Sequence, residues 1–197
     1  TGDDAIYTCD SLIIATGASA KYLGLESEKK YLGKGVSACA TCDGFFYRDQ
    51  EVVVVGGGNT AVEEALYLSN IASKVTLIHR RDKLRAEAIL VDRIKQKEKD
   101  GKVEFVWNHT LDEVLGDNDK VQSVRVKHVE SSEMREIKCS GAFIAIGQPN
   151  TDIFRGSLDM DDTGYLNIKG GSSGNATQCS IEGCLLYTSD AADDSYR

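Results

Sequence analysis

Short apolar runs, each followed by glycine or by polar residues, dominate the pattern of this chain. Runs of this length that are rich in Val and Ile are typical of buried strands in a parallel sheet, because both faces of such a strand are covered. The predicted strands are Ser11–Ala15, Val52–Val55, Lys74–Ile78, Val103–Val106 and Gly141–Gly147.

Two stretches between these strands carry apolar residues at helical spacing. Asn59–Asn70 directly follows the glycine-rich segment Gly56–Gly58, and Lys83–Lys99 is a charged amphipathic stretch. The order strand, glycine turn, helix, strand between Val52 and Ile78 is that of a βαβ unit, whose crossover is right-handed in nearly all proteins. The chain therefore predicts a parallel sheet with helices packed on it.

A second kind of pattern follows, in which apolar and polar residues alternate. Leu111–Leu115 and Val121–Val129 are separated by Gly116-Asp117-Asn118-Asp119, which is typical of a turn between antiparallel strands. We therefore predict an α/β fold, a three-layer Rossmann-like domain with a small antiparallel β excursion. No element is predicted for the polar stretch Lys21–Lys34 or for the residues after Gly183.

Charge and hydropathy exclude two classes of partner. The formal net charge is −8, from 23 Lys and Arg against 31 Asp and Glu, which disfavours nucleic acid and anionic membrane surfaces. No apolar run approaches the roughly 18 residues of a membrane helix. The start, Thr1-Gly2-Asp3-Asp4, has neither an initiator Met nor a signal-peptide core, so we expect a cytoplasmic chain that begins within a longer protein.

The segment between the second predicted strand and its helix has the spacing of a dinucleotide-binding turn. Gly56 permits a tight turn, Gly58 lets the backbone approach a pyrophosphate, and the small Ala61 allows the helix to pack closely on the strand. The free N–H groups at the helix N-terminus then face the anion. The alternative is a glycine turn in some other α/β protein. The predicted nucleotide-binding residues are Gly56, Gly57, Gly58, Asn59, Thr60 and Ala61.

The residues after the next strand indicate which dinucleotide binds. An NAD site has an acidic residue about 20 positions after the glycine motif, where it bonds the ribose 2′-hydroxyl. Here His79 occupies that position, and Arg80, Arg81 and Arg85 follow. Guanidinium groups bind phosphate in a bidentate way, so these residues predict a clamp for a 2′-phosphate and hence NADPH. The alternative is a solvated basic stretch.

Two of the six cysteines form a close pair, Cys39-Ala40-Thr41-Cys42, followed by Asp43. This spacing allows the thiols to close a disulfide, and such pairs usually include one thiol of lowered pKa. Asp43 can move protons as disulfide and thiols interconvert. The alternative is half of a zinc site, which needs a second ligand pair that the scattered remaining cysteines and histidines do not supply. No metal site is predicted.

Together these residues resemble the bacterial-type, low-molecular-weight thioredoxin reductases, and the resemblance covers about Thr8 to Gly183. The segments that carry it are Gly35–Phe46, Gly56–Ala61, His79–Arg81 with Arg85, Ala145–Gly147 and Pro149–Thr151. Members of that family are homodimeric flavoproteins that pass electrons from NADPH to FAD, then to the active-site disulfide and then to thioredoxin.

The resemblance implies a role for each residue of the dithiol segment. Cys42 is expected to face the flavin, Cys39 to attack the protein substrate, and Asp43 to donate the proton. It also implies FAD contacts. The expected FAD contacts are Thr16, Gly17, Ile146 and Gly147.

The family inserts its NADPH domain into its FAD domain, and this implies four segments. Residues 1–21 and 148–183 are expected to be parts of an incomplete FAD-binding domain, and 22–147 to be the NADPH-binding domain with the dithiol. Residues 184–197 depart from the family pattern and are expected to be a non-native tail. With the N-terminal FAD motif absent, we expect that this chain by itself is not fully active.

Two other interpretations stay open at this point. One is the flavoprotein subunit of alkyl hydroperoxide reductase, which resembles this region but prefers NADH, against the evidence of His79-Arg80-Arg81. The other is a non-catalytic NADPH-binding module in which the dithiol responds to oxidants.

Overall fold

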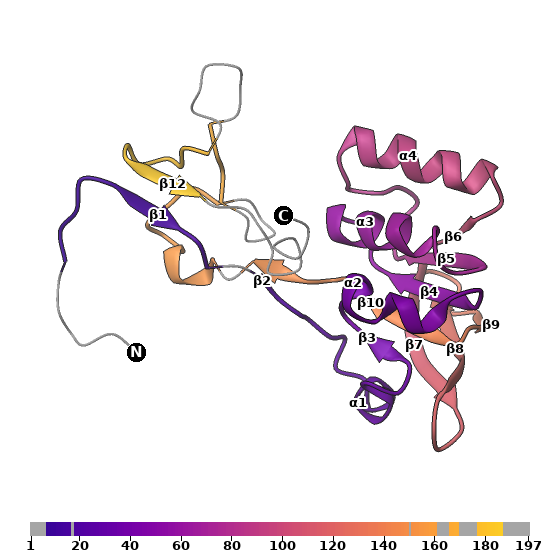
Figure 1. Cartoon of the computed structure of the whole chain (residues 1–197). Coiled ribbons are helices and arrows are strands. Elements are labelled where there is room, and N and C mark those ends of the chain that lie inside the picture. The colour runs from indigo at the N-terminus through magenta and orange to yellow at the C-terminus, as the bar shows by residue number, and fades with distance from the viewer. Residues whose placement is uncertain (1–6, 17, 150, 161–165, 170–176, 187–197) are drawn as a thin grey trace. The chain divides into compact units, whose positions relative to one another are not determined.

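The structure is a computed structural model that describes residues 7–16, 18–149, 151–160, 166–169 and 177–186 (Figure 1). It divides into two compact units, one formed by 1–19 with 148–197 and the other by 20–147. These divisions lie close to the predicted domain boundaries at 21/22 and 147/148.

The larger unit, residues 20–147, contains most of the secondary structure. Its elements are α1 (Glu26–Tyr31), β3 (Val36–Ser37), α2 (Ala40–Asp43), the 3₁₀ helix η1 (Gly44–Tyr47), β4 (Glu51–Val55), α3 (Asn59–Leu68), β5 (Lys74–His79), α4 (Ala88–Lys99), β6 (Val103–Trp107), β7 (His109–Gly116), β8 (Val121–His128), β9 (Met134–Lys138) and β10 (Gly141–Ile144). The predicted α/β class is confirmed, with a parallel sheet and a small antiparallel sheet.

The centre of this unit is a five-stranded parallel sheet in the order β3-β10-β4-β5-β6. Successive side chains of β4 point to opposite faces, because side chains alternate along a strand. Val52 and Val54 pack in one buried cluster with α3 and α4 residues such as Leu68 and Ile94. Val53 and Val55 pack in a second cluster on the other face.

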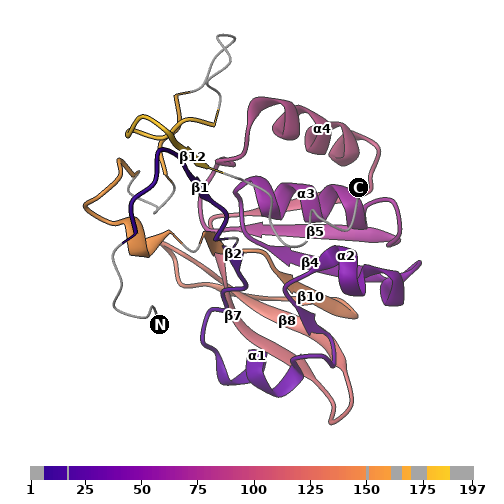
Figure 2. The ribbon, with the colours of Figure 1, turned by 60° about the vertical axis from the view of Figure 1, so that its left-hand side comes forward.

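A three-stranded antiparallel sheet, β7-β8-β9, covers that second face. Val114, Val124 and Val126 are buried there in the same cluster as Val53 and Val55. Figure 2 shows the resulting layers, with α3 and α4 on one side of the parallel sheet and β7 and β8 on the other. The strand β9 was not predicted. Only Ile137 of its five residues is buried, and the sequence of this strand accordingly lacks a clear alternation of apolar and polar residues.

Two further differences from the sequence prediction concern segments that were expected to lack structure. The polar stretch Lys21–Lys34 contains α1, whose Glu28 is buried because its carboxylate accepts the backbone N–H groups of Leu23 and Leu25. In the smaller unit, Cys184–Leu186 form strand β12, with Cys184 buried. The expectation that no element follows Gly183 is therefore wrong for these three residues.

The smaller unit consists of short strands around its own small core. β1 (Leu12–Ile14) pairs in parallel with β12, and β2 (Ala18–Ser19) pairs antiparallel with β11 (Gln148–Pro149); the 3₁₀ helix η2 covers Asp152–Phe154. Its buried cluster is Ile14, Leu158, Leu166, Cys179 and Cys184. No helix among the described residues is long and apolar enough to span a membrane.

Candidate functional site

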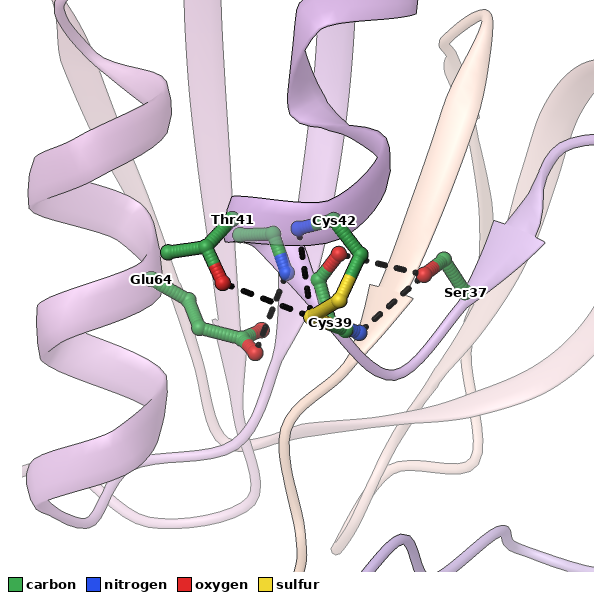
Figure 3. The surroundings of a disulfide bond; sticks show 6 residues. Ser37, Cys39, Thr41, Cys42 and Glu64 are labelled. Carbon is green, nitrogen blue, oxygen red and sulfur yellow. Dashed lines mark hydrogen bonds between the residues drawn. A yellow bond between two sulfur atoms is a disulfide. The ribbon is translucent and has the colours of Figure 1, made fainter. Parts of the chain in front are cut away.

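The predicted dithiol is a disulfide in the structure, at the start of α2 (Figure 3). The sulfur atoms of Cys39 and Cys42 are 2.04 Å apart and the Cα atoms 5.3 Å apart. Cys39 is the N-cap residue of α2, and this helix consists of a single turn, Ala40–Asp43. Both sulfurs are therefore bonded to each other, and the alternative of half a zinc site does not apply to this state.

Two polar groups of the dithiol segment lie close to the Cys39 sulfur. The backbone N–H of Cys42 donates to Cys39 Sγ at 3.2 Å, and the Thr41 hydroxyl lies 3.4 Å from the same atom. Cys42 is exposed whereas Cys39 is half-buried.

Two side chains hold the backbone of the dithiol segment. Ser37 Oγ accepts the backbone N–H of Cys39 at 3.0 Å and donates to the Cys39 carbonyl at 3.4 Å. Glu64 on α3 accepts the backbone N–H of Ala40 through Oε1 at 3.3 Å. Figure 3 shows Glu64 reaching from the neighbouring helix toward the first turn of α2. The dithiol is therefore fixed to β3 on one side and to α3 on the other.

Asp43, the expected proton donor, lies at the end of α2 beside a cleft. The cleft has a volume of about 750 Å³, and Ser37, Asp43, Tyr47 and Cys139 are among the residues that line it. Burial raises the pKa of Tyr47, and the nearby Asp43 carboxylate raises it further. Burial also raises the pKa of the Cys139 thiol to about 12, so this thiol stays protonated.

The glycine turn has the close contacts that its motif requires. Gly56 has φ +155°, and a Cβ there would overlap the Ala145 carbonyl and the Ala61 side chain. At Gly58, the N-cap of α3, a Cβ would meet nothing within 4 Å. The packing within the protein therefore does not require glycine at position 58. The open space lies beside the free N–H groups at the start of α3, and a phosphate group fits there.

The arginine segment lies in a loop, residues 80–87, between β5 and α4. The predicted start of the helix at Lys83 is therefore wrong, because α4 begins at Ala88. Arg80, Arg81 and Arg85 are exposed, and none forms an ion pair with a described residue. Three such guanidinium groups within six residues fit a phosphate group.

His79 ends β5 beneath this loop and is buried. A Cβ at Gly57 would overlap its imidazole ring, so glycine at 57 makes room for His79. Burial lowers the pKa of His79; the charges of Arg81 and Arg80 lower it further, against hydrogen bonds with the Lys83 and Gly56 backbone. The ring is therefore neutral at pH 7, and its predicted contact with the nucleotide stays a prediction. The two halves of the nucleotide motif meet at this contact.

The expected FAD contacts are divided between the two units. Thr16 is half-buried after β1 in the smaller unit, and Gly17 lies outside the described residues. Ile146 and Gly147 follow β10 in the larger unit and are half-buried. Since Thr16 and Ile146 belong to different units, these residues give no single surface against which the fit of a flavin can be judged. The expected FAD contacts therefore stay predictions.

Sequence reasoning missed two residues of this site, Glu64 and Glu87. Glu87 accepts the Asn59 amide at 3.3 Å, and its backbone N–H donates to Asn59 Oδ1 at 2.8 Å. Acidic residues in or beside amphipathic helices usually lie on a solvated face, so the residue type of Glu64 and Glu87 did not indicate a role in the site. For Glu64, the one indication in the sequence was its position on the helix that follows the glycine motif.

Comparison with known proteins decides the family. The model of the pyridine nucleotide-disulphide oxidoreductases matches residues 1–178. The chain belongs to this family. Its members use FAD and NAD(P)H, and the Cys39–Cys42 disulfide and the glycine turn of the larger unit lie in the matched range.

Within the family the chain is similar to thioredoxin reductases, as the motifs indicated. The thioredoxin reductase of Coxiella burnetii is 60% identical over the whole chain, which spans 61% of that protein. A Pseudomonas fluorescens protein named glucosaminate ammonia-lyase is also 60% identical, with the chain again spanning 61% of it. The chain thus spans about three fifths of the length of the curated relatives it matches.

A solved structure agrees. Thioredoxin reductase from Giardia duodenalis superposes with a TM-score of 0.71 and 38% identity, over 91% of this chain and 57% of that one. The resemblance to low-molecular-weight thioredoxin reductases is therefore confirmed.

Proposed function

We propose that this pyridine nucleotide-disulphide oxidoreductase is an NADPH-dependent thioredoxin-disulfide reductase. The observation that carries the proposal is the disulfide Cys39–Cys42 in the same compact unit as a glycine turn with three exposed arginines beside it. When bound, FAD supplies the two-electron transfer between the nicotinamide and this disulfide. The homodimer and the cytoplasmic location that the resemblance implies stay predictions.

The nucleotide side of the reaction depends on binding and orientation. The N–H groups at the start of α3 would hold the pyrophosphate over Gly58, and Arg80, Arg81 and Arg85 the 2′-phosphate. A clamp of this kind selects NADPH over NADH. The preference also separates the proposal from the alternative of an alkyl hydroperoxide reductase subunit, for which we expect no preference for NADPH.

The disulfide side of the reaction is thiol–disulfide exchange. Two electrons and two protons convert the Cys39–Cys42 disulfide into two thiols, and Asp43 is the group at hand to move a proton. The Cys39 thiolate then attacks one sulfur of the substrate disulfide and forms a mixed disulfide, and a substrate thiolate leaves. Attack by Cys42 on Cys39 Sγ releases the second substrate thiol and restores the internal disulfide.

An exposed apolar surface beside the dithiol suits a protein substrate. Phe45 and Phe46, in the 3₁₀ helix η1 that follows α2, are 64% and 72% exposed, and their rings meet edge to face with centroids 6.4 Å apart. Arg48 lies over the Phe45 ring at 5.4 Å. Exposed aromatic and Arg side chains are typical anchors of protein interfaces.

The exchange step can be tested on this chain without FAD. The chain with Cys42→Ser, reduced and mixed with oxidised thioredoxin, is expected to accumulate a mixed disulfide through Cys39, visible as an added thioredoxin mass. Cys39→Ser is the matched control and is expected to trap at least tenfold less. Equal trapping by both variants, or by neither, would contradict the assigned roles.

A further inference from the structure

We propose that Asn59 is a positioning residue for the 2′-phosphate clamp and thereby determines the preference for NADPH, an inference that rests on the proposed function. Asn59 is the first residue of α3, and its side chain ties the glycine turn to the end of the arginine loop. It acts on the 2′-phosphate through Arg80, Arg81 and Arg85 and needs no contact of its own with that group.

The arginine loop is held to the glycine turn at three places. At its start, the His79 ring occupies the space that a Gly57 side chain would fill. In its second half, the backbone N–H of Arg85 donates to the Gly57 carbonyl at 2.7 Å. At its end, Asn59 exchanges two hydrogen bonds with Glu87, which is the N-cap residue of α4.

The third of these attachments is the one in which a side chain forms hydrogen bonds. Asn59 Oδ1 accepts the Glu87 N–H at 2.8 Å, and Asn59 Nδ2 donates to Glu87 Oε1 at 3.3 Å. Residues 80–87 contain no helix or strand, so hydrogen bonds of this kind fix the directions from which the guanidinium groups reach a ligand. A clamp that is already ordered before binding loses less entropy when the phosphate arrives.

The effect is expected only for a ligand that carries a 2′-phosphate. NADP⁺ and NAD⁺ share every group except that phosphate. Loosening the loop is therefore expected to weaken the binding of NADP⁺ and to leave the binding of NAD⁺ nearly unchanged. A direct contact of Asn59 with the shared pyrophosphate would instead weaken both ligands equally.

The test is calorimetric titration of the 197-residue chain with NADP⁺ and with NAD⁺. For Asn59→Ala we expect about tenfold weaker NADP⁺ binding and less than twofold change for NAD⁺, because two hydrogen bonds that order the loop are lost. The control is Asn70→Ala, which removes an exposed asparagine in the turn after α3, where its Oδ1 accepts from Lys97 Nζ of α4 at 2.8 Å. It is expected to change neither affinity.

A second pair of variants tests the hydrogen bond that Asn59 Nδ2 donates, without changing any residue of α3. Glu87→Gln and Glu87→Ala both remove the carboxylate charge, but only glutamine keeps an oxygen that accepts from Asn59 Nδ2. NADP⁺ is expected to bind Glu87→Ala about threefold more weakly than Glu87→Gln. Equal affinities would overturn the inference even where Asn59→Ala does not fold.

The outcomes separate this inference from the proposed function. If the unaltered chain binds NAD⁺ as tightly as NADP⁺, the arginine clamp itself is wrong and both proposals fail. If it prefers NADP⁺ and Asn59→Ala keeps that preference, only the positioning role fails. Equal loss of both ligands would make Asn59 a pyrophosphate contact and would also overturn the inference.

Discussion

At the scale of single residues, His79 shows that a position of the nucleotide motif can have a packing role. Its Nε2 atom is buried and has no hydrogen-bond partner among the described residues. Burial disfavours the charged imidazolium and lowers the pKa of His79, and the hydrogen bonds with the Lys83 and Gly56 backbone offset this only in part. The sequence could place His79 where an NAD site has an acid, but it could not show that the ring fills the space beside Gly57.

The lowered pKa of His79 makes a prediction about acid stability. Above its ordinary pKa of 6.5 the ring is neutral in both the folded and the unfolded chain. As the pH falls below that value, the unfolded chain takes up the proton first, so the folded state loses stability. Between pH 7 and pH 5, the free energy of unfolding, measured with urea, should fall more in the unaltered chain than in the His79→Gln variant. Equal losses would contradict this account.

At the scale of elements, the contact between α2 and α3 joins the dithiol to the nucleotide turn. Glu64 lies on the helix that begins at the glycine turn, and it accepts the N–H of Ala40 next to Cys39. Removing a charged acceptor leaves that N–H without this partner in a half-buried place. The dithiol helix is a single turn, so it depends on such contacts more than a long helix would.

We therefore expect Glu64→Ala to destabilise the chain by about 1–2 kcal/mol and Glu64→Gln by less, because glutamine keeps the accepting oxygen. Urea unfolding of the oxidised chain measures both values. Glu98→Ala, an exposed acid on α4, is the control and should stay within about 0.5 kcal/mol of the unaltered chain. Equal effects of the alanine and glutamine variants would show that the hydrogen bond does not contribute.

The sequence predicted the elements whose apolar residues recur at a regular spacing. It missed elements and boundaries that depend on hydrogen bonds between distant residues. β4 and α3 carry strong apolar patterns and were placed within a few residues. The helix expected from Lys83 begins only at Ala88, because the residues before it are held by Gly57 and Asn59 through bonds that periodicity does not encode. α1 is short and polar, and its buried Glu28 looks like a surface residue in sequence.

At the scale of the whole molecule, the two units have separate cores. The two large buried clusters contain only residues of 20–147, and the third contains only residues of the other unit. A segment that buries its apolar faces within itself is expected to fold alone.

Residues 20–147 should therefore unfold as one cooperative unit when produced without the rest. The single tryptophan, Trp107, lies at the end of β6 in this unit, so its fluorescence reports on it directly. Urea transitions followed by this fluorescence and by circular dichroism should coincide. Separate transitions would show that the unit depends on residues outside its boundaries.

The short ladder between β2 and β11 has a consequence for how such a protein can be rebuilt. Ser19 and Gln148 are register partners, so the chain leaves for residues 20–147 and returns from them at adjacent positions of one two-stranded ribbon. Partners in an antiparallel pair have Cα atoms only about 5 Å apart. Residues 20–147 therefore form a cassette with neighbouring ends, which a relative's counterpart can replace at these two joints without lengthening either connection.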